Sequence, residues 1–441
     1  DIFQKCSKKR RGFLPQSSER ESKMIWHKKL GILLLFALCI CMSGCGRNEK
    51  KSVTISMIHA WGGTEEDHAA MRDIYEEFQK ENPDIILQTI PMPTGKDLCR
   101  KVEDLIMVGD VPDIINFSGI GKNQTYEFII ENDLALDLSS YLEKDLEFAE
   151  RVSDVNKEYW MEKDQGLYSI ADVLTLSGGY WYNQEILDAA GVTEIPKTWM
   201  EFLEMCEKIK GWAEETGNGV EPHHISAEGY IYFMNHLLAE KMIGANGEVS
   251  DRELYNRAMI VLKKIYQYAA SKDEEYTYLD EISMFNQGKL GIFVNGVWGA
   301  KMIHSTVDAK YALLPTMTGQ ALACESVDLG YVLSNSGNME KQEAAVRFLK
   351  YMLSESVQKR ILRETEQIPA NQNVSLEEFA AEKERLYRAA LQVENAEYKI
   401  EAPSNIWSEN QNAFLKENII KVLNGEMSEE EFGKTLESVK D

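Results

Sequence analysis

Several motifs that mark enzymes and metal proteins are missing from this sequence of 441 residues. From Cys45 onward it contains no HExxH, CxxC or GxSxG, and no GxxxxGK[ST] loop to bind phosphate. The histidines follow no metal-ligand spacing, and the adjacent His223 and His224 are expected in an exposed loop. We therefore expect no metal, no cofactor and no catalysis. Among so many acidic residues, a carboxylate pair suited to glycoside hydrolysis stays an alternative.

Cysteine and positive charge are both scarce. The cysteines from residue 45 onward stand alone at Cys45, Cys99, Cys206 and Cys324, a scatter that excludes a disulfide framework. Lys and Arg number 48 against 72 Asp and Glu, which gives a net charge of −24. Such an acidic chain repels nucleic acid, so no DNA or RNA partner is expected.

A hydrophobic run long enough to cross a bilayer is also missing from the N-terminal part. The apolar stretch from Leu30 to Cys41 has twelve residues, whereas a spanning helix needs about 20. Lys28 and Lys29 precede it, and the small residues Ser43 and Gly44 follow. A basic region, a short apolar region and small residues in this order are typical of an export signal.

The stretch MSGC at residues 42–45 resembles the lipobox of bacterial lipoproteins, in which the signal is cut before a cysteine that then carries a diacylglyceryl group. The resemblance implies an upstream segment and signal peptide at 1–44, with Met24 as the expected start of translation. It also implies a lipidated Cys45 and a tether at 45–51, which hold the protein at the outer face of the bacterial cytoplasmic membrane, on the extracellular or periplasmic side. An ordinary secreted protein, cut near the same place, is the alternative.

The remaining chain alternates between strand and helix patterns. A strand at 53–58 is followed by a helix over 65–80, with Thr64 in a capping position, and then by strands at 84–90 and 114–117. This order is typical of a parallel α/β sheet. Thr198 is expected to cap a further helix, and Leu376 to Asp441 is expected to hold helices without strands. Roughly 400 residues exceed what one hydrophobic core usually serves, so two lobes are expected.

Six motifs in a fixed order then resemble one known family. They read GDVPDII, GLYSIADVLTLSGGYWYN, IPKTWMEF, FNQGKLGIFVNGVW, YALLPTMTG and AAVRFLKYML, and they resemble the extracellular sugar-binding proteins of bacterial ABC importers, the class that includes maltose-binding protein. The resemblance implies the type II periplasmic-binding fold: two α/β lobes joined by a multi-strand hinge, with the ligand cleft between them. Its expected boundaries are 52–165 plus 302–355 for lobe 1, and 166–301 plus 356–441 for lobe 2.

The implied function is a monomeric, lipid-anchored receptor that captures a carbohydrate and delivers it to the permease subunits of an ABC transporter by hinge closure. Two alternatives remain open. One is a surface-anchored hydrolase acting on glycans, and the other is the same fold binding a polyamine, a metal chelate or a peptide.

Sugar binding calls for flat aromatic faces and paired hydrogen-bonding groups, which are expected in the turns that follow strands. By its match to the NG-x-W motif, Trp298 is the expected stacking residue. The full set of expected ligand-binding residues is Trp61, Ser118, Gly119, Asp172, Tyr182, Tyr232, Trp298, Asp328, Gly330 and Trp407.

Overall fold

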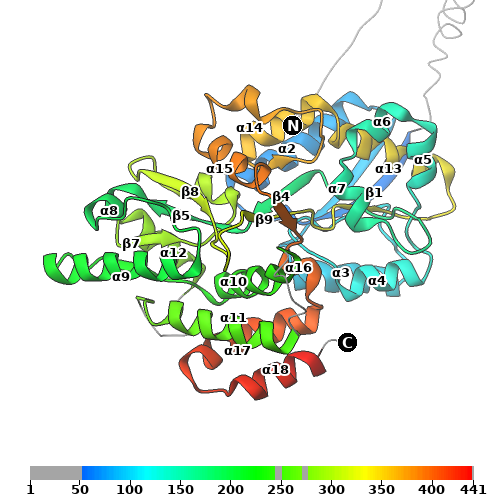
Figure 1. The fold of residues 1–441 in the computed structure, drawn as a ribbon. Coiled ribbons are helices and arrows are strands. Elements are labelled where there is room, and N and C mark those ends of the chain that lie inside the picture. Colours follow the sequence, from blue (N-terminus) through cyan, green and yellow to red (C-terminus); the bar gives the residue numbers. More distant parts are fainter. Residues whose placement is uncertain (1–51, 244–250, 271–276, 440–441) are drawn as a thin grey trace, which may run out of the picture. The chain divides into compact units, whose positions relative to one another are not determined.

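The computed structural model describes residues 52–243, 251–270 and 277–439. The expected signal peptide, the lipidation site Cys45 and the tether at 45–51 lie outside the described residues. From Val53 onward, the described residues belong to one compact unit, which is made of two lobes with a small sheet between them (Figure 1).

Lobe 1 is built on a sheet with the strand order β10-β3-β1-β2. Strand β1 pairs in parallel with β2 and β3, as the alternation of strands and helices predicts, while β10 is antiparallel to β3. The strands are β1 (Val53–His59), β2 (Ile85–Pro91), β3 (Ile114–Asn116) and β10 (Tyr331–Leu333). The helices are α2 (Glu66–Glu81), α3 (Lys96–Met107), α4 (Gln124–Glu131), α5 (Ser139–Lys144), α6 (Leu146–Arg151), α7 (Asp154–Trp160), α13 (Met339–Met352) and α14 (Glu355–Thr365).

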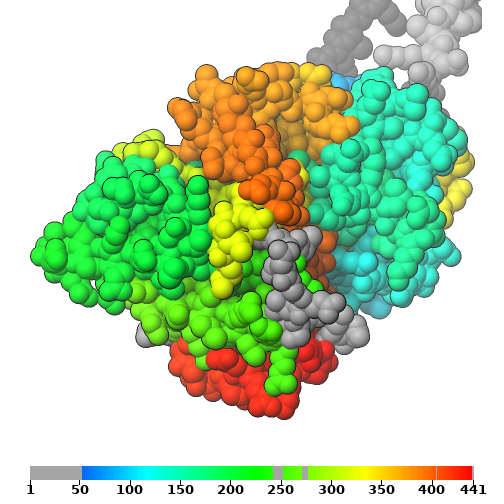
Figure 2. Space-filling view, viewed as in Figure 1, coloured from blue at the N-terminus to red at the C-terminus, as the bar shows by residue number. Residues whose placement is uncertain are grey.

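Lobe 2 is built on a sheet with the strand order β6-β7-β5-β8, in which β5 is antiparallel to both neighbours. Its strands are β5 (Gly179–Asn183), β6 (Glu221–His223), β7 (Leu290–Phe293) and β8 (Ala309–Leu313). Its α-helices are α8 (Gln184–Ala189), α9 (Trp199–Thr216), α10 (Ala227–Ala239), α11 (Asp251–Tyr266), α12 (Tyr278–Asn286), α15 (Glu384–Glu394), α16 (Pro403–Ile406), α17 (Glu409–Asn424) and α18 (Glu429–Ser438). Three 3₁₀ helices complete it: η1 (Glu240–Ile243), η2 (Val297–Met302) and η3 (Leu376–Phe379). Figure 2 shows α17 and α18, in red, against the green helices of this lobe.

A third sheet, ordered β11-β4-β9-β12, lies where the chain passes between the lobes. Its strands are β4 (Val173–Ser177), β9 (Leu322–Ser326), β11 (Ile368–Pro369) and β12 (Tyr398–Ile400). We call it the hinge sheet. Strand β12 contradicts the expectation that the C-terminal part holds no strand. The strand has only three residues, too few to produce a visible alternation of apolar and polar side chains.

The pairing also moves two expected lobe boundaries. Strand β8 pairs along its whole length with β5 and belongs to lobe 2, although the sequence placed residues from 302 onward in lobe 1. Helix α14 contributes Val357 and Ile361 to the core of lobe 1, although residues from 356 onward were expected in lobe 2. Both errors arise because a strand or a helix carries no local signal for the lobe against which it packs.

Of the local features expected from the sequence, one helix cap is confirmed, whereas a second cap and the exposure of two histidines are wrong. Thr198 caps α9 in a complete capping box with Glu201, as expected. Helix α2 begins after Glu65, whose side chain makes no cap hydrogen bond, so the capping role of Thr64 is wrong. His223 and His224 are buried rather than exposed, because β6, which ends at His223, carries this stretch into the interior of lobe 2.

Candidate functional site

A cleft made of three adjoining pockets is lined by both lobes and the hinge sheet. The deep pocket of about 320 Å³ lies in lobe 2, next to the end of β4. The central pocket of about 420 Å³ is lined by lobe 1, lobe 2 and the hinge sheet, and the outer pocket of about 730 Å³ lies between α3 and α17. Tyr232 lines all three, and Trp298 lines the deep and central pockets. These shared side chains make the pockets one continuous cleft.

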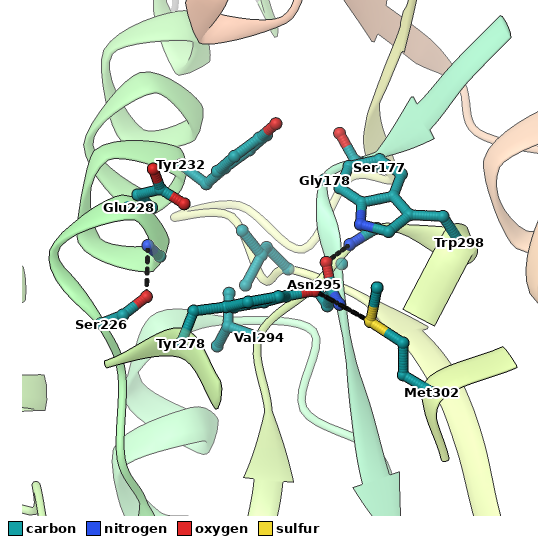
Figure 3. A pocket seen from close by; sticks show the side chains of 14 residues that line it. Ser177, Gly178, Ser226, Glu228, Tyr232, Tyr278, Val294, Asn295, Trp298 and Met302 are labelled. Atoms are coloured by element: carbon teal, nitrogen blue, oxygen red, sulfur yellow. Dashed lines mark hydrogen bonds between the residues drawn. The ribbon is translucent and has the colours of Figure 1, made fainter. Parts of the chain in front are cut away.

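Three aromatic side chains from separate segments surround the deep pocket. Figure 3 shows Tyr232 above the cavity, Tyr278 below it and Trp298 to the right. They come from α10, α12 and η2 respectively. The Asn295 side-chain amide donates to the Tyr278 hydroxyl over 2.7 Å, and that hydroxyl donates to the sulfur of Met302 over 3.1 Å. The pocket therefore combines flat apolar faces with oriented polar groups.

The orientation of Trp298 depends on a glycine two residues earlier. A Cβ on Gly296 would lie 2.0 Å from the indole of Trp298, so only glycine lets this ring approach the backbone so closely. The carbonyl of Gly296 accepts a hydrogen bond of 3.0 Å from the indole of the buried Trp181. The hydrogen bond from the core residue Trp181 thus fixes the turn, while Trp298 lies half-buried at the pocket wall.

The lobe 1 wall of the central pocket is formed by two turns at the carboxyl ends of neighbouring parallel strands. Trp61 follows β1, and Ser118 and Gly119 follow β3. The Arg72 guanidinium donates to the carbonyls of Trp61 and Gly63 over 2.6 and 2.9 Å. This arginine on α2 fixes the loop that carries Trp61.

Asp328 is a carboxylate of the central pocket whose pKa is raised. It is half-buried, and the Thr175 hydroxyl donates to it over 3.4 Å. Burial raises its pKa to about 6, and the hydrogen bond from Thr175 opposes that rise only in part. A carboxylate so placed can accept hydrogen bonds from ligand hydroxyls or amines.

Charged pairs join elements around the cleft. Lys301, three residues after Trp298, forms an ion pair with Asp67 on α2 and so links lobe 2 to lobe 1. Burial disfavours the charge of Asp67, but the hydrogen bond and charge of Lys301 lower the pKa of Asp67 overall. In the outer part of the cleft, Lys416 pairs with Glu228 at 2.6 Å.

Within the described ranges, no cluster of three or more His, Cys, Asp or Glu side chains could hold a metal ion. Of the helices in these ranges, none combines the length and the apolar character needed to cross a membrane.

Comparison with known proteins assigns the family. Residues 61–359 match the family described as bacterial extracellular solute-binding protein. The chain belongs to this family. A putative ABC transporter periplasmic-binding protein of Escherichia coli K12 is 28% identical over 191 residues, 41% of each chain. The multiple sugar-binding protein of Streptococcus mutans is 24% identical over 357 residues, 75% of this chain and 79% of that protein.

Solved structures share the fold. A solute-binding protein of Streptococcus pneumoniae, solved in complex with the blood group A-trisaccharide, superposes with a TM-score of 0.70 at 23% identity, covering 88% of this chain and 99% of that one. The two-lobed periplasmic-binding architecture expected from the sequence is thereby confirmed for this solute-binding protein.

Six of the expected ligand-binding residues line the cleft of this solute-binding protein. They are Trp61, Ser118, Gly119, Tyr232, Trp298 and Asp328.

Asp172 and Gly330 lie instead inside the hinge region. The Asp172 carboxylate is 1% exposed and accepts a 2.9 Å hydrogen bond from the Tyr331 hydroxyl, while its carbonyl accepts from the amide of Ala370. A Cβ on Gly330 would meet the Ile170 carbonyl at 2.1 Å. Both residues therefore join crossing segments, and neither lines the three pockets.

Tyr182 and Trp407 are part of lobe 2's packing. Tyr182 lies in the core beside Tyr180, because helices cover both faces of the sheet and β5 is buried throughout. Trp407 is half-buried against the same core just before α17. Neither side chain lines the three pockets.

The structure also brings forward cleft residues that the sequence did not suggest. Tyr278, Glu228 and Asn295 line the deep pocket with the expected Trp298. Asn295 stands within the quoted motif FVNGVW and could have been found there. Tyr278 and Glu228 lie at helix starts with no distinguishing pattern, so only the packing of α10 and α12 reveals them.

Proposed function

We propose that this solute-binding protein captures a carbohydrate outside the cell and delivers it to the permease of an ABC importer. The observation that carries the proposal is the set of three aromatic faces, Tyr232, Tyr278 and Trp298, around one pocket with polar groups between them. Aromatic faces cover the C–H surfaces of a sugar ring, while Asn295 and Asp328 offer partners for its hydroxyls. The names of two similar proteins, which mention multiple sugars and a trisaccharide, agree with this cargo.

Hinge closure is the proposed mechanism. Trp61, Ser118 and Gly119 come from lobe 1, whereas Tyr232 and Trp298 come from lobe 2. A ligand that touches both sets gains contacts only when the lobes are together, so it shifts the population toward the closed form that a permease would recognise. Binding requires no covalent step and no cofactor.

We further propose a lipid anchor at Cys45 and a monomeric state. The anchor rests on the resemblance of residues 42–45 to a lipobox. Replacement of Cys45 by Ser in the full-length protein, expressed in a bacterial host, should move it from the membrane fraction to the medium or periplasm. Membrane association of the Cys45→Ser protein equal to that of wild type would count against the anchor.

The cargo is tested by a thermal-shift screen against raffinose, maltotriose, xylotriose and N,N′-diacetylchitobiose, with spermidine and a tripeptide as non-sugar probes. A ligand that binds only the native state raises Tm by mass action. We expect stabilisation by a sugar that is recovered chemically unchanged. Stabilisation by spermidine or the peptide alone would reject the sugar cargo, and cleavage of the sugar would favour a hydrolase.

A further inference from the structure

A buried carboxyl group lies directly behind the deep pocket. Glu281 on α12 is 0% exposed. Its Oε1 accepts a hydrogen bond of 3.2 Å from the amide of Val294, and its Oε2 accepts one of 3.4 Å from the amide of Ser226. Buried polar groups without such partners are costly, so these two bonds fix the carboxyl between two backbone segments.

Both segments carry residues of the pocket wall. Ser226 is the N-cap of α10, the helix that presents Tyr232 to the cavity. Val294 directly follows β7 and begins the turn that leads to Trp298. Glu281 itself lies one helical turn after Tyr278. One side chain thus connects the three segments that supply the three aromatic faces.

We propose that Glu281 is a positioning residue of the ligand cleft, which holds the start of α10 and the end of β7 at the spacing the ligand needs and couples ligand uptake to its own proton. The inference rests on the proposed function only in taking the deep pocket to be a ligand site.

The environment of Glu281 favours the neutral acid. Burial raises its pKa to about 8, although the two amide donors favour the carboxylate. Of the neighbouring titratable groups, Tyr278 on the same helix has its pKa raised by burial to about 12, and burial raises the pKa of Tyr230 on α10 well above its ordinary value. Burial lowers the pKa of His224, so it is neutral at alkaline pH.

Two further acidic groups lie near this wall. Glu228 on α10 forms an ion pair with Lys416 at 2.6 Å. Asp280 on α12 accepts hydrogen bonds from Thr277, which lower its pKa. Glu281, with its pKa raised to about 8, therefore changes charge between about pH 7 and pH 9.5.

A ligand in the deep pocket excludes water from the wall formed by Ser226 and Val294. The dielectric around Glu281 then falls, which favours its neutral form further. Because the bound state holds the proton more tightly, ligand affinity must fall as the pH rises above about 8. Each unit by which binding raises this pKa corresponds to a tenfold loss of affinity at high pH.

The test compares wild type with Glu281→Gln, which stays uncharged at both pH values. Its carbonyl oxygen can accept from one of the two amides, while its NH2 group cannot accept from the other, so the pH dependence and not the absolute protection is compared. The matched control is Glu240→Gln: Glu240 is another buried acid of lobe 2, bonded to the indole of Trp199, and it lines none of the three pockets. The first measurement needs no ligand. It follows amide hydrogen exchange of peptides covering 226–232 and 294–298 at about pH 7 and pH 9.5, corrected for the chemical exchange rate.

We expect protection of both peptides to fall at the higher pH in wild type and in Glu240→Gln, but not in Glu281→Gln. The second measurement is the affinity for the panel sugar that raises Tm most, which should fall at high pH in the same two proteins only. Identical pH profiles in wild type and Glu281→Gln would overturn the proposal. If no sugar binds, the proposed cargo fails while the exchange experiment still decides the role of Glu281.

Discussion

Replacement of Trp298 by Ala tests the cleft most directly. The half-buried indole lines two of the three pockets, so part of its face is free to be covered by a ligand. A tryptophan can bury about 150–250 Å², and we take roughly 60–100 Å² of it as the area that a sugar ring would cover. At about 25 cal/mol per Å², this loses about 1.5–2.5 kcal/mol of binding free energy. The dissociation constant should rise roughly 10- to 60-fold.

Isothermal titration calorimetry with the sugar found in the screen measures this loss, and circular dichroism with a thermal melt confirms folding. Trp212→Ala is the matched control, since Trp212 is also half-buried in lobe 2 but lies on α9 outside the three pockets. Trp212→Ala should leave affinity unchanged, and Trp298→Phe should keep most of it because a flat face remains. A folded Trp298→Ala protein with wild-type affinity would refute the stacking role of Trp298.

Three further outcomes are expected. Lys301→Met removes the ion pair with Asp67 between the lobes. It should weaken ligand binding by about 0.5–1 kcal/mol at low salt and by less at high salt. The same salt dependence of affinity in wild type and Lys301→Met would contradict this. Gly330→Ala should lower Tm by several degrees or prevent folding, because its Cβ would meet the Ile170 carbonyl at 2.1 Å; an unchanged melt would disprove the close approach. Burial raises the pKa of Glu240 to about 7 from an ordinary 4.5, so the folded state holds this proton more tightly, and stability is lost as pH rises from about 4.5 to 7. In urea melts, the free energy of unfolding should fall between pH 5 and pH 8 by about 2–3 kcal/mol less in Glu240→Gln than in wild type. If the fall is the same in both proteins, Glu240 is not the group responsible.

Local signals predicted much of the fold. The strand, helix and strand of lobe 1 and the cap at Thr198 were readable because periodicity and capping involve residues within one or two turns. The lobe to which β8 belongs and the presence of strand β12 could not be predicted from local signals. Their placement depends on pairing with β5 and β9, which lie far away in the chain.

The candidate site also has some features that the sequence predicts and others that only the tertiary structure shows. The sequence by itself determined that aromatic and acidic residues follow the strands of an α/β protein, and a motif drew attention to Trp298. Only the tertiary structure decided that Asp172 and Tyr182 are enclosed while Tyr278 reaches the pocket. The physical reason is that a side chain's access to a cleft depends on which segments cover it. That covering is set by the packing of two lobes and a hinge, not by the residue's own neighbours in sequence.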